Sequence, residues 1–271
     1  MLPETMPVCP VRGSVIYPTM VMPIDAGRPI SIRAIDEALA RDRVLLIVSQ
    51  RDKEVETPRP SDLFEVGTAC NILKMRKNPD GSVQVLVQAF ARVRVREWLD
   101  LGDHLEARGE VLADEPGEPI LVKALVREVK DKFQALLKEG KYLAPEVAQF
   151  ILNLEDPSQL ADYVAFHMDF RLEDKQKVLE TANVAERLRA VLVLLEAELA
   201  LIETQRRIQQ QVKEEIDRNQ REYFLREQMK AIQRELHGEE GEQEVEEFRR
   251  KLEALDLPPV GPPLGRLLEE V

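Results

Sequence analysis

The sequence has few of the residues on which small metal sites and disulfide-bonded folds depend. Its only cysteines are Cys9 and Cys70, too few for a disulfide scaffold or a closed zinc site, and both stand in apolar surroundings. We therefore predict two reduced thiols in the core. The three histidines, His104, His167 and His237, lie far apart, and none belongs to a metal-ligand pair such as His-Glu-x-x-His. Each is predicted to be a surface or helix-end residue.

Two signatures of catalysis are also missing. No Gly-x-x-x-x-Gly-Lys-Ser/Thr loop is present, and Gly261 to Arg266 has the wrong spacing and no lysine. No serine stands in Gly-x-Ser-x-Gly, so a serine nucleophile has no local support. The chain by itself is predicted to be non-catalytic, with no catalytic residue, no metal and no cofactor.

Positive charge and long apolar runs are scarce. The formal net charge is −12, which argues against a general nucleic-acid binder. Arg92, Arg94 and Arg96 alternate along one predicted strand, and we interpret them as a solvated face. The longest apolar run, Ala190 to Leu195, is far below the ~20 residues of a membrane span, and the N-terminus has no basic stretch before an apolar core. We expect a soluble, cytoplasmic protein with no membrane partner.

What the sequence does contain divides into a β-rich part and a helical part, which predicts an α+β fold. Residues 6 to 112 hold short runs rich in β-branched residues, separated by Gly, Pro and Asp. Asn78-Pro79-Asp80-Gly81 predicts a hairpin turn, and one helix is expected from Pro29. The predicted strands are Val8 to Val11, Val15 to Ile16, Met20 to Ile24, Val44 to Val48, Gly67 to Met75, Ser82 to Phe90 and His104 to Leu112.

From Ile120 the apolar period changes to about 3.6, which is typical of helices. One stripe, Leu121 to Leu136, ends at Gly140, and Pro145 is placed to begin the next helix. Asp156-Pro157 reads as a cap followed by proline at the first helical position. Asn183 with Glu186 resembles a capping box.

One very long helix is predicted from Val184 to His237, because no proline or glycine interrupts this stretch before Gly238. It would extend roughly 80 Å. Within it, Ile208, Val212 and Ile216 are spaced by four among charged residues, which suggests a solvated strut. The acidic segment Glu239 to Glu247 is predicted to be mobile, and the prolines at 258–259 and 262–263 to stop any further helix.

Two apolar segments are candidates for binding other proteins. At the far end of the long helix, apolar side chains wrap around more than one face. Near the N-terminus, three apolar residues between Pro18 and Pro23 form either an adaptable surface for extended peptides or part of the core. The candidates are Tyr223, Phe224, Leu225 and Met229 in the first segment and Met20, Val21 and Met22 in the second.

Three blocks of the sequence together resemble the N-terminal region of the ATP-dependent Lon proteases, over about Leu2 to Leu257. The opening block contains Pro10-Val11-Arg12-Gly13, Tyr17-Pro18, Met22-Pro23-Ile24, Gly27-Arg28-Pro29 and Ser31-Ile32. A second block contains Leu160-Ala161-Asp162, Lys175 to Glu180 and Glu186-Arg187-Leu188. The most specific string runs from Gln220 to Leu236 and reads QREYFLREQMKAIQREL.

The resemblance implies a PUA-like β domain over residues 1–115, a helical bundle over 116–202, a long-helix strut over 203–237 and an acidic, proline-rich tail over 238–271 that leads toward an ATPase module. It implies a role in recognising unfolded or damaged proteins and short-lived regulatory proteins, and in assembling homo-oligomers, usually hexamers. ATP and Mg²⁺ are implied for full-length members, which cut substrates with a Ser-Lys dyad. Neither the phosphate loop nor the dyad is in this sequence.

Two other interpretations remain. In the first, the long helix serves only to join copies of the chain, which makes this a structural oligomerisation module. In the second, a PUA-like domain binds RNA through Arg92, Arg94 and Arg96, against which the negative charge of the chain argues.

Overall fold

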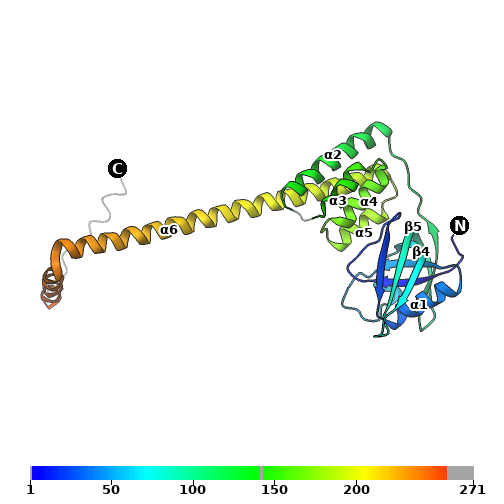
Figure 1. Ribbon diagram of the computed structural model, residues 1–271, viewed down its shortest axis with the longest axis horizontal. Helices are drawn as coiled ribbons and strands as arrows, with labels where there is room; N and C mark the ends of the chain where they lie inside the picture. Colours follow the sequence, from blue (N-terminus) through cyan, green and yellow to red (C-terminus); the bar gives the residue numbers. More distant parts are fainter. Residues whose placement is uncertain (1, 141–142, 255–271) are drawn as a thin grey trace, which may run out of the picture. The chain divides into compact units, whose positions relative to one another are not determined.

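The computed structural model describes residues 2–140 and 143–254, and the chain divides after Glu203 into two compact units. The first unit holds all the strands and the shorter helices (Figure 1). The second unit holds the rest of the last helix, α6. This combination confirms the α+β prediction.

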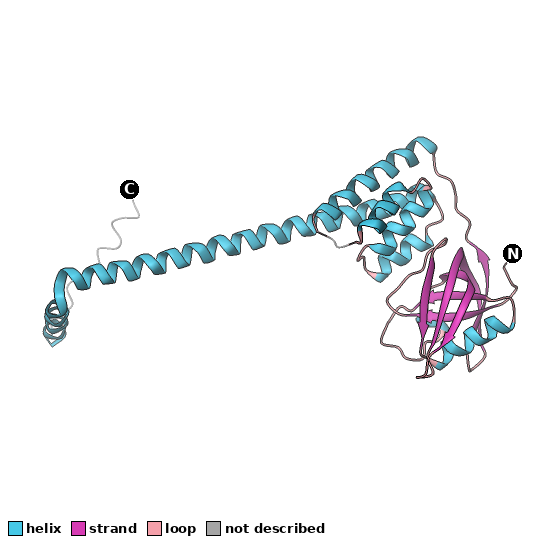
Figure 2. Ribbon diagram, in the orientation of Figure 1, coloured by secondary structure: helices cyan, strands magenta, loops and turns pink. Residues whose placement is uncertain are grey.

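Six strands form one sheet that closes on itself (Figure 2). The order is β2-β5-β4-β3-β1-β6, and β5 also pairs with β6. Closure depends on the length of β5, whose first half pairs with β2 and whose second half pairs with β6. Only β1 and β3 are parallel. The strands are β1 (Met6–Val11), β2 (Val21–Ala26), β3 (Val44–Ser49), β4 (Val66–Lys77), β5 (Val83–Asp100) and β6 (Leu105–Val111).

Alternation along the strands divides the buried side chains of this sheet between two clusters. Cys9, Leu45 and Ile47 belong to the cluster that includes α1 (Pro29–Ala40), whereas Val8 and Leu46 belong to the other. Both cysteines are buried and unbonded, as predicted. A short 3-10 helix, η1 (Pro60–Asp62), precedes β4.

The predicted strands and turns hold with one exception. Asn78 to Gly81 forms the expected turn, in which the Gly81 amide donates to the Asn78 carbonyl at 3.1 Å and Gly81 takes a φ of +86°. The prediction of a strand at Val15 and Ile16 is wrong, because both are buried in irregular chain. Two consecutive apolar residues can be buried equally well in chain that forms no hydrogen bonds to a neighbouring strand.

The helical part of the first unit is built as its caps and stripes indicate. The Asp156 carboxylate accepts from the Ser158 and Gln159 amides, and the Asn183 side chain accepts from the Ala185 and Glu186 amides. The helices share one core, to which α2 contributes Leu125, Val129, Phe133 and Leu136. They are α2 (Pro119–Lys138), α3 (Pro145–Asn153), α4 (Pro157–His167), α5 (Leu172–Glu180) and the first part of α6 (Val184–Ala254).

The barrel and the helices are joined through shared burial and direct hydrogen bonds. Tyr17 and Met20, from the chain before β2, lie in the helical core. The Tyr17 hydroxyl donates to the Lys175 carbonyl at 2.8 Å, and burial raises the pKa of this phenol well above its usual value. The Gln176 side-chain amide donates to the Val66 carbonyl at 2.8 Å.

The predicted end of the long helix is wrong. α6 continues through Gly238 and Gly241 to Ala254, so the acidic segment expected to be mobile is helical. A glycine costs a helix only about 1 kcal/mol relative to alanine, which is a weak stop signal without a proline beside it. A Lys251–Glu247 pair at 3.1 Å adds i,i+4 support near the end. The proline pairs at 258–259 and 262–263 lie outside the described residues.

Within the described ranges, no helix is both long enough and apolar enough to cross a membrane.

Candidate functional site

A groove lies between the barrel and α4. It has a volume of about 290 Å³ and is lined by apolar side chains, among them Pro18, Phe90 and Val111, and by polar ones, among them Asp156 and Gln159. Phe90 is 38% exposed and Val111 is 51% exposed, so both keep apolar surface in contact with solvent. The groove therefore presents apolar surface that the fold itself leaves uncovered.

The chain at the rim of the groove is held in a fixed and costly conformation. Thr19 has a φ of +69°, which β-branched residues rarely adopt. Its amide donates to the Ala89 carbonyl at 2.9 Å, and the Ala89 amide donates to the Met20 carbonyl at 2.8 Å. These two bonds clamp the Pro18–Thr19 turn beside Phe90.

A buried ion pair connects the two walls of this groove. Arg92 of β5 donates from Nη2 to both carboxylate oxygens of Asp162 in α4, at 2.5 and 2.6 Å. Arg187 at the start of α6 donates to Asp114 at 2.6 Å and to the Ser158 hydroxyl at 2.7 Å. Two arginines and two aspartates thus join β5, the chain after β6, α4 and α6.

The charges in this cluster are balanced, and three of the four side chains are buried, whereas Asp114 is 36% exposed. Burial raises the pKa of Asp162 to about 6, against the lowering effect of the Arg92 and Arg187 charges. Nε of Arg92 has no hydrogen-bond partner in the part of the chain that the structure describes. Because the Arg92–Asp162 pair is shielded from water, loss of either partner would leave the other charge buried and uncompensated. The pair therefore joins β5 to α4 only while both partners are present.

This geometry corrects the interpretation of Arg92, Arg94 and Arg96 as one solvated face. Arg92 is only 4% exposed and is neutralised by Asp162, while Arg96 pairs with Glu110. A register shift in the β5–β6 pairing between Val95 and Glu97 breaks the alternation on which the prediction relied.

The prediction for His104 is also wrong. It lies buried at the start of β6, with ring nitrogens 2.6 Å from Asp103 and 3.3 Å from Glu106. A histidine flanked by carboxylates can be satisfied in the interior, which the sequence spacing alone does not reveal. His167 is in the last turn of α4, as expected for a helix-end residue.

The predicted contact segment near the N-terminus is only partly on the surface. Met20 is 4% exposed and belongs to the helical core, which corrects its proposed role as a surface contact in favour of core packing. Met22 is half-buried against the α1 side of the barrel. Val21 is 54% exposed.

The predicted residues of α6 belong to the second unit, and each is at least 49% exposed. This applies to Ile208, Val212, Ile216, Tyr223, Phe224, Leu225 and Met229.

Sequence reasoning missed the groove, although one signal for it was present. Val83, Val85 and Val87 of β5 belong to the buried cluster that includes α1, so alternation places Phe90 on the opposite face of the strand, where it is 38% exposed. Nothing in the sequence marks Val111 as its neighbour, because the two meet only through the fold.

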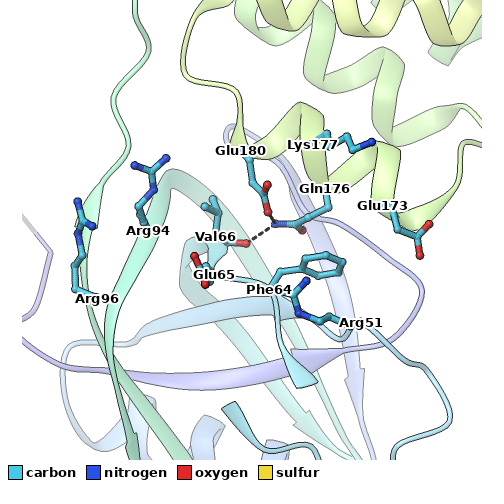
Figure 3. Close-up of a pocket in the computed structure, with 10 residues that line it drawn as sticks. All are labelled: Arg51, Phe64, Glu65, Val66, Arg94, Arg96, Glu173, Gln176, Lys177 and Glu180. Carbon is cyan, nitrogen blue, oxygen red and sulfur yellow. Dashed lines mark hydrogen bonds between the residues drawn. The ribbon is translucent and has the colours of Figure 1, made fainter. Parts of the chain in front are cut away.

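A second cleft, of about 560 Å³, lies between the barrel and α5 (Figure 3). Charged side chains of both signs line it, with Arg94 and Arg96 from β5 on one side and Glu173 and Lys177 from α5 on the other. The guanidinium of Arg51 lies 4.6 Å from the centroid of the Phe64 ring at its floor.

No group of three or more His, Cys, Asp or Glu side chains suited to a metal ion occurs within residues 2–140 and 143–254.

Comparison with known proteins agrees with this description. The family model of the ATP-dependent protease La (LON) substrate-binding domain matches residues 5–197. The Lon protease of Escherichia coli (strain K12) is 40% identical over 253 residues, which are 93% of this chain and 32% of that protein. The Lon protease of Brevibacillus choshinensis is 38% identical over 254 residues, 93% of this chain and 33% of that protein. The chain thus spans about a third of the length of these curated relatives.

A solved structure is also similar. The N-terminal domain of the Mycobacterium avium complex Lon protease superposes with a TM-score of 0.60 at 26% sequence identity. The match covers 71% of this chain and 98% of that one.

Proposed function

This chain belongs to the Lon protease family and carries its substrate-binding domain, and from that premise we propose that the groove bordered by Pro18, Phe90 and Val111 binds apolar segments of polypeptide substrates. The observation that carries the proposal is the exposure of Phe90 and Val111 on a rigid rim. Native proteins bury such segments, whereas unfolded and damaged proteins expose them. A groove of this kind discriminates by fold state rather than by sequence.

The rest of the proposed role follows from the family. The chain recognises misfolded, damaged and short-lived regulatory proteins in the cytoplasm for an ATP-dependent serine protease that assembles as a hexamer. ATP, Mg²⁺ and the Ser-Lys dyad would belong to other modules of that protease, and the 271 residues contribute binding. The family match to a substrate-binding domain supports this division of roles.

The test is capture of one model protein in its native form and in a stably unfolded form by the purified chain. We expect selective capture of the unfolded form and a loss of affinity in a Phe90→Ser, Val111→Ser double variant. A matched control, Leu73→Ser with Met75→Ser, removes two exposed apolar side chains of β4 outside the groove. Equal binding by the wild type and the groove variant would refute the assignment of the groove.

A second role, assembly of copies, is supported by the apolar stripe of α6. Ile208, Val212 and Ile216 repeat every four residues on a charged helix and are about half exposed. We expect the number of chains per particle, obtained from the mass in dilute solution, to fall when the chain is truncated at Thr204. An unchanged number of chains would mean that this helix does not assemble the isolated chain.

Nucleic-acid binding is the weaker alternative. Of the three alternating arginines, Arg92 and Arg96 already pair with carboxylates, so they do not form a continuous basic strip. An absence of salt-dependent RNA binding would dismiss it.

A further inference from the structure

A second pocket adjoins the groove, and its walls are mainly apolar. It has a volume of about 300 Å³, at the lower end of the range for ligand pockets. It lies where α2, α4 and α6 begin, beside the chain that joins the barrel to α2. Its apolar side chains are those of Pro116, Pro119, Val122, Pro157 and Val184.

The joining chain is fixed against the start of α6, so this proline pocket is formed before any ligand binds. The Glu115 amide donates to the Ala182 carbonyl at 3.0 Å, and the Val184 amide donates to the Glu115 carbonyl at 3.0 Å. A Cβ atom at Gly117 would lie 2.6 Å from the Cβ of Ala185, so only glycine permits this close approach. A preformed pocket binds with a smaller loss of conformational entropy than one that must be ordered.

Three helices begin at the proline pocket, yet most N–H groups that could hold an anion there are absent or already bonded. Pro119 and Pro157 have no N–H, and the side chains of Asp156 and Asn183 cap α4 and α6. The carboxylates of Asp114 and Asp156 also line the pocket. The occupant that these walls favour is therefore an uncharged apolar group rather than an anion.

The groove and the proline pocket are neighbours, because Asp114, Asp156 and Ser158 line both. The Ser158 hydroxyl donates to Asp114, and Arg187 donates to both residues. The Arg187 side chain is 0% exposed and that of Asp114 is 36% exposed, so the arginine lies on the interior side of this pair. A bound chain can therefore pass from one cavity to the other on the solvent side of Asp114 and Ser158.

We propose that the groove and the proline pocket together bind one extended polypeptide segment that carries an apolar residue for each, separated by a short spacer without acidic residues. One apolar side chain lies beside Phe90 and Val111, and the other beside Pro119 and Val122. The spacer passes Asp156, an exposed carboxylate that repels acidic side chains. This inference deepens the proposed function and rests on it, since the same segment fills both cavities.

Two linked contacts have a recognisable dependence on spacer length. Once one apolar group is bound, the second binds from an effective concentration that the spacer sets. A spacer too short to reach gives no gain, and affinity is highest when its length matches the separation of the cavities. A second apolar group that only adds non-specific contact gives a gain at every spacer length.

The test uses the complete chain and labelled peptides of glycine and serine. One set carries two leucine-phenylalanine pairs with spacers of increasing length, and the matched peptide carries one such pair. We expect the peptide with the best spacer to bind at least about tenfold more tightly than the one-pair peptide, and aspartate in that spacer to weaken binding. An affinity that does not vary with spacer length, or that equals that of the one-pair peptide, would overturn the proposal.

Variants locate the second contact. Pro119→Asp replaces an exposed apolar side chain at the first position of α2, where a negative charge is compatible with the helix dipole. It should reduce the two-pair peptide to the affinity of the one-pair peptide. Pro145→Asp makes the same change at the first position of α3, outside both cavities, and should have no effect.

Val122→Thr provides a second variant, because it keeps the shape of the side chain and adds a hydroxyl to the pocket wall. It should weaken the two-pair peptide in the same direction. An advantage of the two-pair peptide that survives both Pro119→Asp and Val122→Thr would refute this pocket. A change in the number of chains per particle without a change in peptide affinity would place the pocket between copies of the chain, which also overturns the proposal.

This proposal and the proposed function fail separately. Selective capture of unfolded protein together with no dependence on spacer length overturns only the proline pocket. An absence of unfolded-protein capture by the wild type overturns the proposed function itself.

Discussion

Removing Asp162 should destabilise the first unit more than any change at an exposed ion pair. In an Asp162→Ala variant, Nη2 of Arg92 loses its hydrogen bonds to both carboxylate oxygens, at 2.5 and 2.6 Å. Arg187 loses a neighbouring negative charge at 3.9 Å. Both arginines are at most 4% exposed and cannot recover hydration without moving. Breaking a buried pair in this way costs about 3–5 kcal/mol. Since a domain has only about 5–15 kcal/mol in total, the loss is readily measured.

The assay is urea unfolding followed by the fluorescence of Trp98, the only tryptophan of the chain. Trp98 lies in β5, the strand that carries Arg92, so its signal reports the barrel and is independent of the helical signal of α6. The matched control is Glu110→Ala, which breaks the Arg96 pair on the same strand, where both side chains are more than half exposed. Exposed pairs contribute about 0–1 kcal/mol.

A double variant distinguishes the attraction between Arg92 and Asp162 from the free-energy cost of burying their charges. Arg92→Met with Asp162→Leu removes both charges and keeps apolar volume, so it should recover much of the stability lost in Asp162→Ala. If Asp162→Ala costs no more than Glu110→Ala, the buried cluster does not hold the barrel to the helices, and the reasoning is wrong.

Two further predictions concern titrating groups of the first unit. Burial raises the pKa of Asp162 from 3.8 to about 6, so the folded state binds this proton more tightly than the unfolded state, and the contribution of Asp162 to the free energy of unfolding falls as pH rises from about 4 to about 6. Asp162→Asn should remove that component of the slope in urea titrations at several pH values, and an unaltered slope would contradict it. Burial also raises the pKa of Cys9 to about 11 and that of Cys70 above its usual range, so a thiol reagent at pH 8 should label neither residue in the native chain and both in urea. Rapid labelling without denaturant would show that the barrel opens at this end.

The local elements could be predicted from the sequence because their causes are local. Proline at the first position of α2, α3 and α4, the Asp156 and Asn183 caps and the turn at Asn78 to Gly81 each act within a few residues. The change of apolar period near Ile120 separates barrel from helices in the same way.

Errors arose where a local signal was weak or ambiguous. Glycine at 238 is a mild penalty rather than a stop, so the end of α6 was placed too early. The apolar character of Val15, Ile16 and Met20 is compatible with a strand, with a binding surface and with irregular chain in the core. Only the packing of these residues in the folded chain distinguishes the three cases.

The sequence by itself determined which segments are strands and helices, which side chains are apolar and which family the chain resembles. The tertiary structure alone decided the sites. Arg92 and Asp162 are 70 positions apart, Gln176 and Val66 are 110 apart, and Phe90 meets Val111 only because the barrel closes through β5 and β6. Each pairing depends on register and on how helices dock against strands, which are long-range outcomes of burial that no local pattern encodes.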